Sequence, residues 1–238
     1  MLFSKRRKRT TKRGRVVFAQ GSKAEGIYCM ESGIALLSHR SEEGEMTVFG
    51  VVGPGECFGY RSYFADDPHG ARASALSRCK YCFIPRDTFD ALLYSNKELA
   101  RSFLRVVARD QGPRHGPSLR NPQLSVRLRL IYLLALFRER FSVEQENGEL
   151  LFDLPMTRRN IAAMIGTRPE TLTRALGALE REGAILFDRH LIRVIDPHRL
   201  FDERARGTVA GPSNQSPHLS PTCGVRDKRC RWLPEVRG

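Results

Sequence analysis

The sequence predicts an α+β protein, in which an antiparallel β-roll precedes a helical region and a compact C-terminal part. Three observations predict this class. Short β-rich pieces separated by glycines run from Arg15 to about Ile84, a pattern typical of antiparallel sheets. The apolar period then changes from that of strands to that of helices. Two closely spaced helix starts follow after residue 156.

The charge balance of the chain is typical of a protein that binds a polyanion. The 238 residues include 40 Lys and Arg against 26 Asp and Glu, a net charge of +14. The 41% of hydrophobic residues can form a globular core, which excludes wholesale disorder. The longest apolar run, 130–137, is too short to cross a bilayer, and the N-terminus has no apolar stretch of a secretory signal. We therefore expect a cytoplasmic protein with reduced cysteines.

The N-terminal arm, residues 1–14, is strongly basic, and no acidic residue precedes Arg15. We interpret it as a solvated, frayed segment that raises non-specific affinity for nucleic acid, with a specific DNA-contacting arm as the alternative. The β-roll follows at 15–95. Its strands are expected at 16–18, 26–30, 34–37 and 46–52, with a hairpin turn at Glu43-Gly44.

A connecting region at 96–142 contains two amphipathic helices. Apolar residues between Leu99 and Val107, and again between Val126 and Phe137, follow helical spacing. Between them, Gly112 to Pro122 contains three prolines, each of which costs a helix about 3 kcal/mol. We therefore expect the helix to break there rather than to run as one rod over 97–141.

The C-terminal part begins with a polar loop at 143–149 and a short strand at 150–152. Two helices and a β pair at 185–194 complete a compact domain over 143–200. The tail, 201–238, is rich in Gly, Pro, Ser and Arg without apolar periodicity, so we expect it to be disordered.

The two helices carry the signature of a helix-turn-helix. Thr157 is a suitable N-cap for the first helix, and Gly166 suits the position that ends it. The segment Thr167 to Glu170 matches a capping box with proline in the first turn of the second helix. In that helix Leu172, Ala175, Leu176 and Leu179 share one face, which we expect to be buried.

The outward face of the second helix can contact DNA. Arginine makes bidentate bonds to guanine, glutamate accepts from cytosine N4, and neighbouring arginines can contact phosphates. The alternative is that Glu170 only caps the helix and Arg174 is only solvated. The candidate DNA-binding residues are Thr157, Arg158, Arg159, Arg168, Glu170, Thr173, Arg174 and His190.

Two motifs carry a resemblance to a known family: Thr-Arg-Arg-Asn-Ile-Ala-Ala-Met-Ile-Gly from Thr157 and Pro-Glu-Thr-Leu-Thr-Arg from Pro169. With the β-rich part and the helix that precede them, they resemble the Crp/Fnr superfamily of transcription regulators over roughly residues 15–200. The pieces 18–21, 26–28, 31–33 and 54–59 resemble turns of that family's cyclic-nucleotide-binding-like β-roll. The resemblance implies a homodimer whose winged helix-turn-helix domains enter successive major grooves about 34 to 36 Å apart. It makes 96–142 the dimerisation helix region, which normally continues through the stretch interrupted here near 112–122. Either the helix is kinked and dimer packing is altered, or the paired helices use only part of the region, and the sequence leaves both open. The resemblance also implies double-stranded DNA and RNA polymerase as partners. From the short apolar runs we expect no membrane association.

Within the family, Glu170, Thr173 and Arg174 resemble the Glu-x-x-Ser-Arg pattern of the Fnr and FixK branch, with Thr in place of Ser. The resemblance implies a palindrome of TTGAT-like half-sites, with Arg174 on guanine and Glu170 on cytosine. The extra methyl of Thr173 leaves open how its base is read. Residues 185–194 resemble the wing, where Arg189 and His190 approach phosphates.

The effector is less well defined. The cyclic-nucleotide branch uses Gly-Glu-Leu for the ribose and Arg-Ser or Arg-Thr for the phosphate, whereas this chain has Gly59-Tyr60-Arg61 and, in the preferred alignment, His69-Gly70. We do not expect cyclic-nucleotide dependence. The candidate effector pocket, Tyr60, Arg61, His69 and Arg72, either binds an anion or is surface charge.

No cofactor is predicted. An iron-sulfur cluster of the Fnr type is not expected, because no cysteine precedes Val16, while haem is left open. The Cys79-Lys-Tyr-Cys82 motif is a weak zinc signal, because residues three apart on a strand point to opposite faces. Buried inert thiols or a redox pair are its other interpretations.

We expect no enzymatic activity. The rival functions are an effector module that regulates protein partners and a redox or metal sensor that depends on Cys79 and Cys82.

Overall fold

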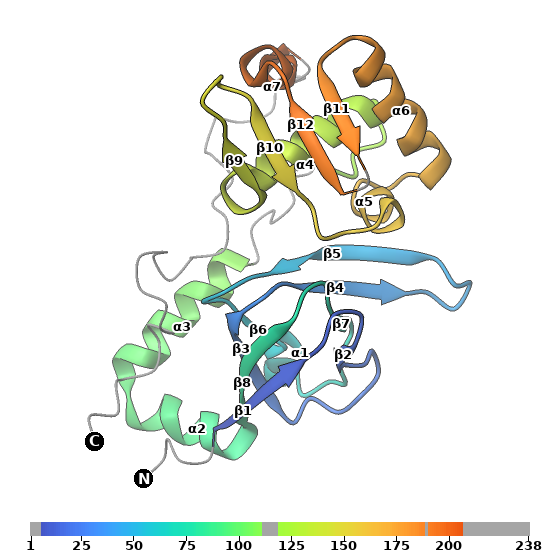
Figure 1. Ribbon diagram of the computed structural model, residues 1–238. Coiled ribbons are helices and arrows are strands. Elements are labelled where there is room, and N and C mark those ends of the chain that lie inside the picture. The colour runs from blue at the N-terminus through green and yellow to red at the C-terminus, as the bar shows by residue number, and fades with distance from the viewer. Residues whose placement is uncertain (1–5, 111–118, 189, 207–238) are drawn as a thin grey trace. The chain divides into compact units, whose positions relative to one another are not determined.

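The computed structural model describes residues 6–110, 119–188 and 190–206 (Figure 1). The chain divides into two compact units, one containing described residues 6–110 and the other containing described residues 119–206. Each unit is described by itself below. No helix among the described residues is long and apolar enough to cross a membrane.

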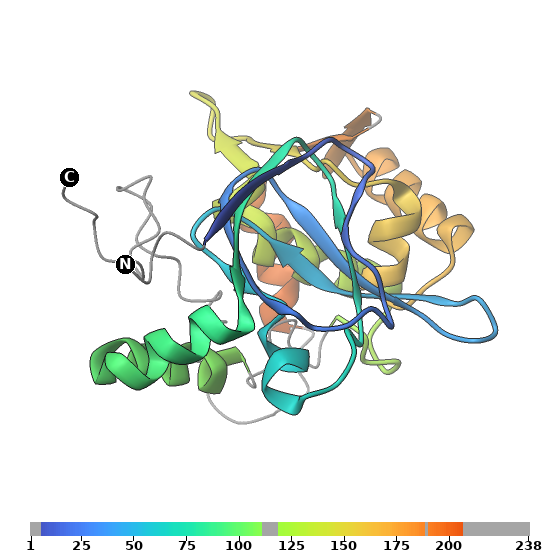
Figure 2. The same cartoon turned by 90° about the horizontal axis from the view of Figure 1, so that it is seen from below.

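The first unit is a roll of two four-stranded antiparallel sheets, which confirms the predicted β-roll. Figure 2 shows the strands of this unit around the interior of the roll, with the unit's own helices, 60–65, 86–95 and 97–110, outside them. One sheet has the order β1-β8-β3-β6: Arg7–Thr11, Cys79–Pro85, Gly26–Ser32 and Cys57–Phe58. The other has the order β2-β7-β4-β5: Val16–Phe18, Arg72–Ala75, Ala35–Arg40 and Met46–Val52.

Four of these strands, β2 to β5, lie where the sequence predicts them. The predicted hairpin joins β4 to β5, and Gly44 adopts a φ of 84° in its turn, a conformation that favours glycine. The Ser41 backbone N–H donates to the Glu45 carbonyl at 2.9 Å and closes this turn. Each of these short segments between glycines pairs with a neighbouring strand, and this pairing stabilises it as a strand.

The side chains of β3 alternate between two cores. Tyr28 and Met30 point into the roll, where the Tyr28 ring packs against Phe58 of its own sheet and Phe18 of the other. Ile27 and Cys29 point outward, into a second cluster with the helices α1 (Tyr60–Ala65), α2 (Arg86–Ser95) and α3 (Lys97–Asp110). This alternation is the two-residue period of a strand buried on both faces.

The prediction of a frayed N-terminal arm is wrong for residues 7–11, which form β1 at the edge of the first sheet. The strand pairs with β8, the Arg9 guanidinium lies 4.9 Å from the centre of the Phe83 ring, and the Thr11 and Tyr81 hydroxyls are 3.0 Å apart. An edge strand can keep charged side chains in solvent, so the charge run did not prevent pairing.

The connecting region contains the two predicted helices. The helix α3 ends at Asp110, and α4 runs over Val126–Phe141 after the N-cap Ser125, whose side chain accepts from the Leu128 N–H at 3.2 Å. Part of the predicted interruption, 111–118, lies outside the described residues. The helix α3 belongs to the first unit and α4 to the second.

The second unit packs α4, α5 (Arg158–Met164), α6 (Pro169–Arg181) and α7 (Pro197–Arg206) with a four-stranded antiparallel sheet. The apolar side of α4 supplies much of its core, including Leu130, Leu133 and Leu134. The sheet confirms the predicted strand and β pair and adds β9 within the predicted loop. Its order is β11-β12-β10-β9: Ile185–Asp188, Leu191–Val194, Leu150–Asp153 and Ser142–Glu144.

The disordered tail was predicted to begin at residue 201, and this boundary is wrong, because α7 continues to Arg206. The Asp196 side chain accepts from the Arg199 N–H at 2.9 Å and caps the helix, and Pro197 stands in its first turn. Leu200 is 1% exposed and fixes the helix to the unit. Residues 207–238, with Cys223 and Cys230, lie outside the described residues.

Candidate nucleic-acid interface

The turn between α5 and α6 is held by backbone geometry. The Thr157 hydroxyl accepts from the Asn160 N–H at 3.2 Å, which confirms the predicted N-cap of α5. Gly166 has a φ of 63°, and the Thr167 N–H donates to the Ala162 carbonyl at 2.9 Å. A left-handed glycine followed by this bond is the Schellman ending of a helix.

The predicted capping box at Thr167 is wrong. The N-cap of α6 is Arg168, no side chain caps the helix there, and Pro169 is its first residue. Thr167 instead belongs to the ending of α5, since its N–H bonds back to Ala162. Thr167 therefore stands one residue before the N-cap of α6 and does not cap that helix.

The two faces of α6 divide as expected, except that Ala175 is only half-buried. Leu172, Leu176 and Leu179 are buried, whereas Glu170, Thr173 and Arg174 are exposed near its N-terminal end. Thr173 donates its hydroxyl proton to the Pro169 carbonyl at 2.9 Å, and Arg174 Nη2 lies 3.4 Å from Thr171 Oγ1. The hydroxyl of Thr173 thus has an intrahelical partner, and the guanidinium of Arg174 is tethered loosely within the exposed face.

The other candidate contacts lie on α5, the turn and the β pair. The Arg158 guanidinium stands 4.6 Å from the centre of the Phe187 ring, so β11 supports it. Arg159 and Arg168 are exposed. His190 Nε2 is 3.7 Å from Asp153 Oδ1 in an exposed pair that links the β11–β12 turn to β10. Arg189 lies outside the described residues.

Sequence reasoning missed the arginines that position this motif. Arg129 of α4 donates from Nη1 to the Ile165 carbonyl at 2.7 Å and to the Gly166 carbonyl at 3.0 Å. Arg120 donates to the Ala163 carbonyl at 3.1 Å. These carbonyls form the negative end of α5. Burial lowers the pKa of Arg129. On α4 itself Arg129 looks like any surface arginine, so no local signal reveals its role.

Two further contacts fix the second half of α6. Arg127 of α4 forms an ion pair with Glu182 at 2.7 Å, just after the helix ends. Glu180 accepts from the Phe187 N–H at 2.9 Å and ties α6 to β11. The exposed face of α6 is therefore presented on a helix that is anchored along its length.

The four candidate effector residues do not share one environment. Tyr60 is buried in the outer cluster, edge-on to Phe103 with ring centres 5.6 Å apart, and Arg61 beside it is exposed. Arg72 is exposed on β7, and its Nε lies 3.1 Å from Ser74 Oγ.

His69 is the buried member of the four. It is 2% exposed and stacks on Phe18 with ring centres 3.8 Å apart. Its Nε2 has no hydrogen-bond partner among the described residues, and burial lowers the pKa of the imidazole. His69 therefore fills the roll interior as an aromatic side chain, separate from the cluster that contains Tyr60.

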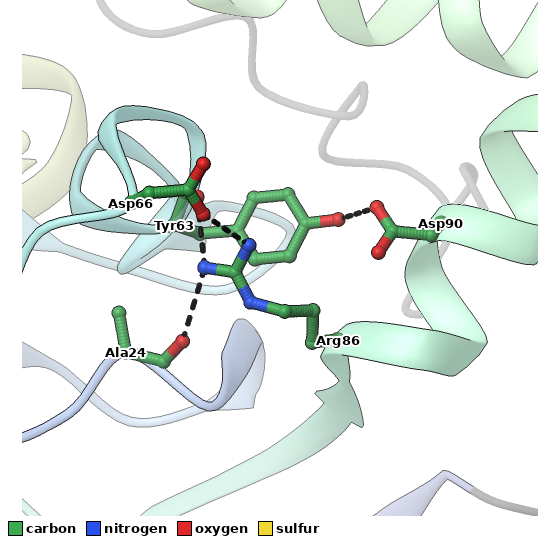
Figure 3. A network of polar contacts seen from close by, with 5 residues as sticks. All are labelled: Ala24, Tyr63, Asp66, Arg86 and Asp90. Atoms are coloured by element: carbon green, nitrogen blue, oxygen red, sulfur yellow. Dashed lines mark hydrogen bonds and ion pairs between the residues drawn. The ribbon is translucent and has the colours of Figure 1, made fainter.

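A polar network fixes α1 to α2 beside this region (Figure 3). The Arg86 guanidinium lies 4.4 Å from the centre of the Tyr63 ring, pairs with Asp66 at 2.6 Å and donates to the Tyr63 carbonyl at 3.0 Å. The Tyr63 hydroxyl donates to Asp90, and burial raises the pKa of that hydroxyl. The segment after Gly59 is thus held rigidly against α2.

The fold and these sites define a two-part protein, with an effector-type β-roll and a winged helix-turn-helix. Family models agree with both parts: "Cyclic nucleotide-binding domain" matches residues 8–96, and "Crp-like helix-turn-helix domain" matches residues 128–202.

Relatives and solved structures agree as well. The CRP-like cAMP-activated global transcriptional regulator of Mycobacterium tuberculosis is 27% identical over 82% of this chain and 86% of its own length. The transcriptional activator protein Anr of Pseudomonas protegens is 29% identical over 87% of this chain and 83% of its own. The structure of FixK2 from Bradyrhizobium japonicum has a TM-score of 0.71 at 20% identity, covering 83% of this chain and 96% of that one. The chain belongs to the Crp/Fnr superfamily and is a transcription regulator with a DNA-binding helix-turn-helix domain.

Proposed function

We propose that this regulator acts as a homodimer that recognises a palindrome of TTGAT-like half-sites through α6. The observation that carries the proposal is the exposed group Glu170, Thr173 and Arg174 at the N-terminal end of a helix whose opposite face is buried. The N-terminal residues of a recognition helix are the ones that contact base edges in the major groove.

Each exposed side chain suits a base contact. The Arg174 guanidinium has the donors for a bidentate bond to guanine, and the Glu170 carboxylate accepts from cytosine N4. The Thr173 hydroxyl donates its proton to the Pro169 carbonyl, so the side chain can offer a base only an acceptor oxygen and a methyl group. A methyl group suits apolar contact with thymine.

The remaining candidates, Thr157, Arg158, Arg159, Arg168 and His190, are proposed as phosphate contacts that fix register. All five are exposed and lie on α5, on the turn before α6 or on the β11–β12 turn. Arg158 is held over Phe187, which reduces the side-chain freedom it loses on binding. The net charge of +14 favours association with DNA at long range.

RNA polymerase is the proposed protein partner, and the cytoplasm is the expected place of action. The relatives FnrL of Cereibacter sphaeroides and Anr are named as transcriptional activators, which favours this role. We assign no cofactor. Tyr60 and Arg61 replace the family's ribose-binding residues, and His69 fills the interior near Gly59, features that speak against a cyclic nucleotide.

The test is selection of bound sites from random duplex DNA by the purified full chain at about 0.15 M salt without added ligand. The expected result is an enriched palindrome of TTGAT-like half-sites. Binding that is sensitive to salt but blind to sequence contradicts the proposal for the ligand-free protein. An enriched site of another sequence contradicts the assigned base contacts.

A further inference from the structure

Three cysteines form a row across the first sheet of the roll. Cys29 of β3 is the register partner of Cys57 on β6 and of Cys82 on β8. All three side chains lie in the outer cluster. Cys79 belongs to the interior cluster, so the two cysteines of the CxxC motif point to opposite faces, as the strand geometry predicts.

Backbone pairing distinguishes the two neighbours of Cys29. Met30 directs its backbone groups to the segment that leads into β6: its N–H donates to the Glu56 carbonyl at 2.9 Å, and its carbonyl accepts from the Gly55 N–H at 2.8 Å. Since successive residues of a strand direct their backbone groups to opposite neighbours, Cys29 directs its own away from β6, and Cys29 and Cys57 form the closer, non-hydrogen-bonded kind of pair, with Cα atoms typically about 4.5 Å apart. Cys29 then directs its backbone groups to β8, so its pair with Cys82 is of the wider kind, typically about 5.5 Å.

The sulfur atoms of the closer pair lie side by side. Cys29 Sγ and Cys57 Sγ are 2.8 Å apart. Facing side chains at a close cross-strand position satisfy the separation that a disulfide requires. Cys29 is 2% exposed, whereas Cys57 is partly exposed. An oxidant from solvent therefore reaches Cys57 first and finds Cys29 directly behind it.

We propose that Cys29 and Cys57 form a reversible redox pair, which a peroxide converts to a disulfide. The Cys57 sulfur attacks one peroxide oxygen, the O–O bond breaks, and the leaving hydroxide takes the Cys57 proton and departs as water, so that Cys57 becomes a sulfenic acid. The Cys29 sulfur then attacks the Cys57 sulfur, the S–O bond breaks, and the leaving hydroxide takes the Cys29 proton and departs as the second water. In sum, two thiols and one hydrogen peroxide give one disulfide and two waters.

The disulfide would bond β6 covalently to β3. The two-residue strand β6 leads directly through Gly59 into α1, which packs with α3 in the outer cluster. The bond closes the loop from Cys29 to Cys57 and restricts the unfolded chain, so the oxidised protein should melt at a higher temperature. This inference is independent of the proposed DNA site.

The test uses the reduced full chain, treated with hydrogen peroxide, alkylated under denaturing conditions and digested with trypsin. Cleavage after lysine and arginine places the four described cysteines on separate peptides, 24–40, 41–61, 79–80 and 81–86. We expect a species that joins 24–40 to 41–61 and disappears on reduction with dithiothreitol. The same species should form in the variant Cys223→Ser/Cys230→Ser, which removes the two cysteines of the tail.

Matched variants make the assignment specific. Cys57→Ser should lose the linked species and leave Cys29 fully alkylated, while Cys82→Ala should retain it. Oxidation should raise the melting temperature of Cys223→Ser/Cys230→Ser and leave that of the same protein with Cys57→Ser unchanged. The proposal is overturned if peptide 24–40 joins 81–86 instead, or if Cys57 is over-oxidised while Cys29 stays a thiol.

Discussion

At the scale of single residues, the exposed polar side chains of the second unit divide into two kinds. Arg174 lies on the outward face of α6, where a base edge can be reached, while Arg159 lies exposed on α5. The first kind is expected to carry sequence specificity and the second kind affinity, because phosphates are the same in every sequence. Two substitutions separate these roles.

Arg174→Ala should weaken binding to a TTGAT-type site by about 1 to 3 kcal/mol and relax discrimination at the guanine. Arg159→Ala should weaken binding to all sequences similarly and reduce the salt slope by about one unit. The measurement is fluorescence-anisotropy titration of specific and scrambled duplexes at several salt concentrations. Equal losses on both duplexes for both variants would contradict the division.

His69 should make the first unit sensitive to acid. Burial lowers the pKa of this imidazole, so the folded state favours the neutral form. As the pH falls below about 6.5, the unfolded chain takes up a proton that the folded chain resists, and stability decreases until the folded pKa is passed. Above about pH 6.5 both states hold neutral His69, and its contribution to the stability of the folded state is fully present.

His69→Phe should remove this component, since a phenyl ring keeps the stacking on Phe18 without a titrating nitrogen. The measurement is the thermal melting temperature between about pH 7.5 and pH 5.5. The drop should be larger for the parent protein than for the variant. Parallel curves would show that other groups cause the acid sensitivity.

At the scale of elements, the helix-turn-helix depends on α4 as much as on its own two helices. Arg129 bonds the carbonyls of Ile165 and Gly166 at the end of α5. Arg129→Met keeps the apolar stem but leaves two carbonyls without this donor. The second unit should lose about 1 to 3 kcal/mol of unfolding free energy, measured by urea denaturation followed by circular dichroism.

A matched control for Arg129→Met is Arg138→Met on the same helix. Among the described residues, the Arg138 side chain makes only a long ion pair with Glu144, at 3.7 Å between two exposed side chains, so its replacement should change stability by less than about 1 kcal/mol. Similar losses in both variants would refute the special role of Arg129.

Element boundaries were predictable where a local signal existed and failed where contacts from elsewhere decided them. The glycine-bounded strands β2 to β5 and the cap of α5 at Thr157 were visible in the sequence. The strand β1 was not, because its charged residues gain order only by pairing with β8. The Thr167 cap failed because backbone closure of α5 uses that residue.

At the scale of the whole molecule, the proposed homodimer makes a prediction about spacing. Two half-sites read by a symmetric dimer must face the same side of the duplex, about 10 to 10.5 base pairs apart centre to centre. Lengthening the spacer by about 5 base pairs turns one half-site to the opposite side. Affinity in a gel-shift titration should then fall to that of a single half-site, and unchanged affinity would contradict a rigid dimer.

The sequence by itself determined the order of the parts and the chemistry of the recognition helix. Periodicity, glycine positions and the motifs from Thr157 and Pro169 are local properties, so they predicted the β-roll, the helices and the exposed face of α6. Only the tertiary structure decided which distant residues meet. Pairing across strands set Cys29 against Cys57, packing stacked His69 on Phe18, and α4 brought Arg129 to α5. The reason is physical, since register and packing arise from contacts between remote segments, and no local pattern encodes them.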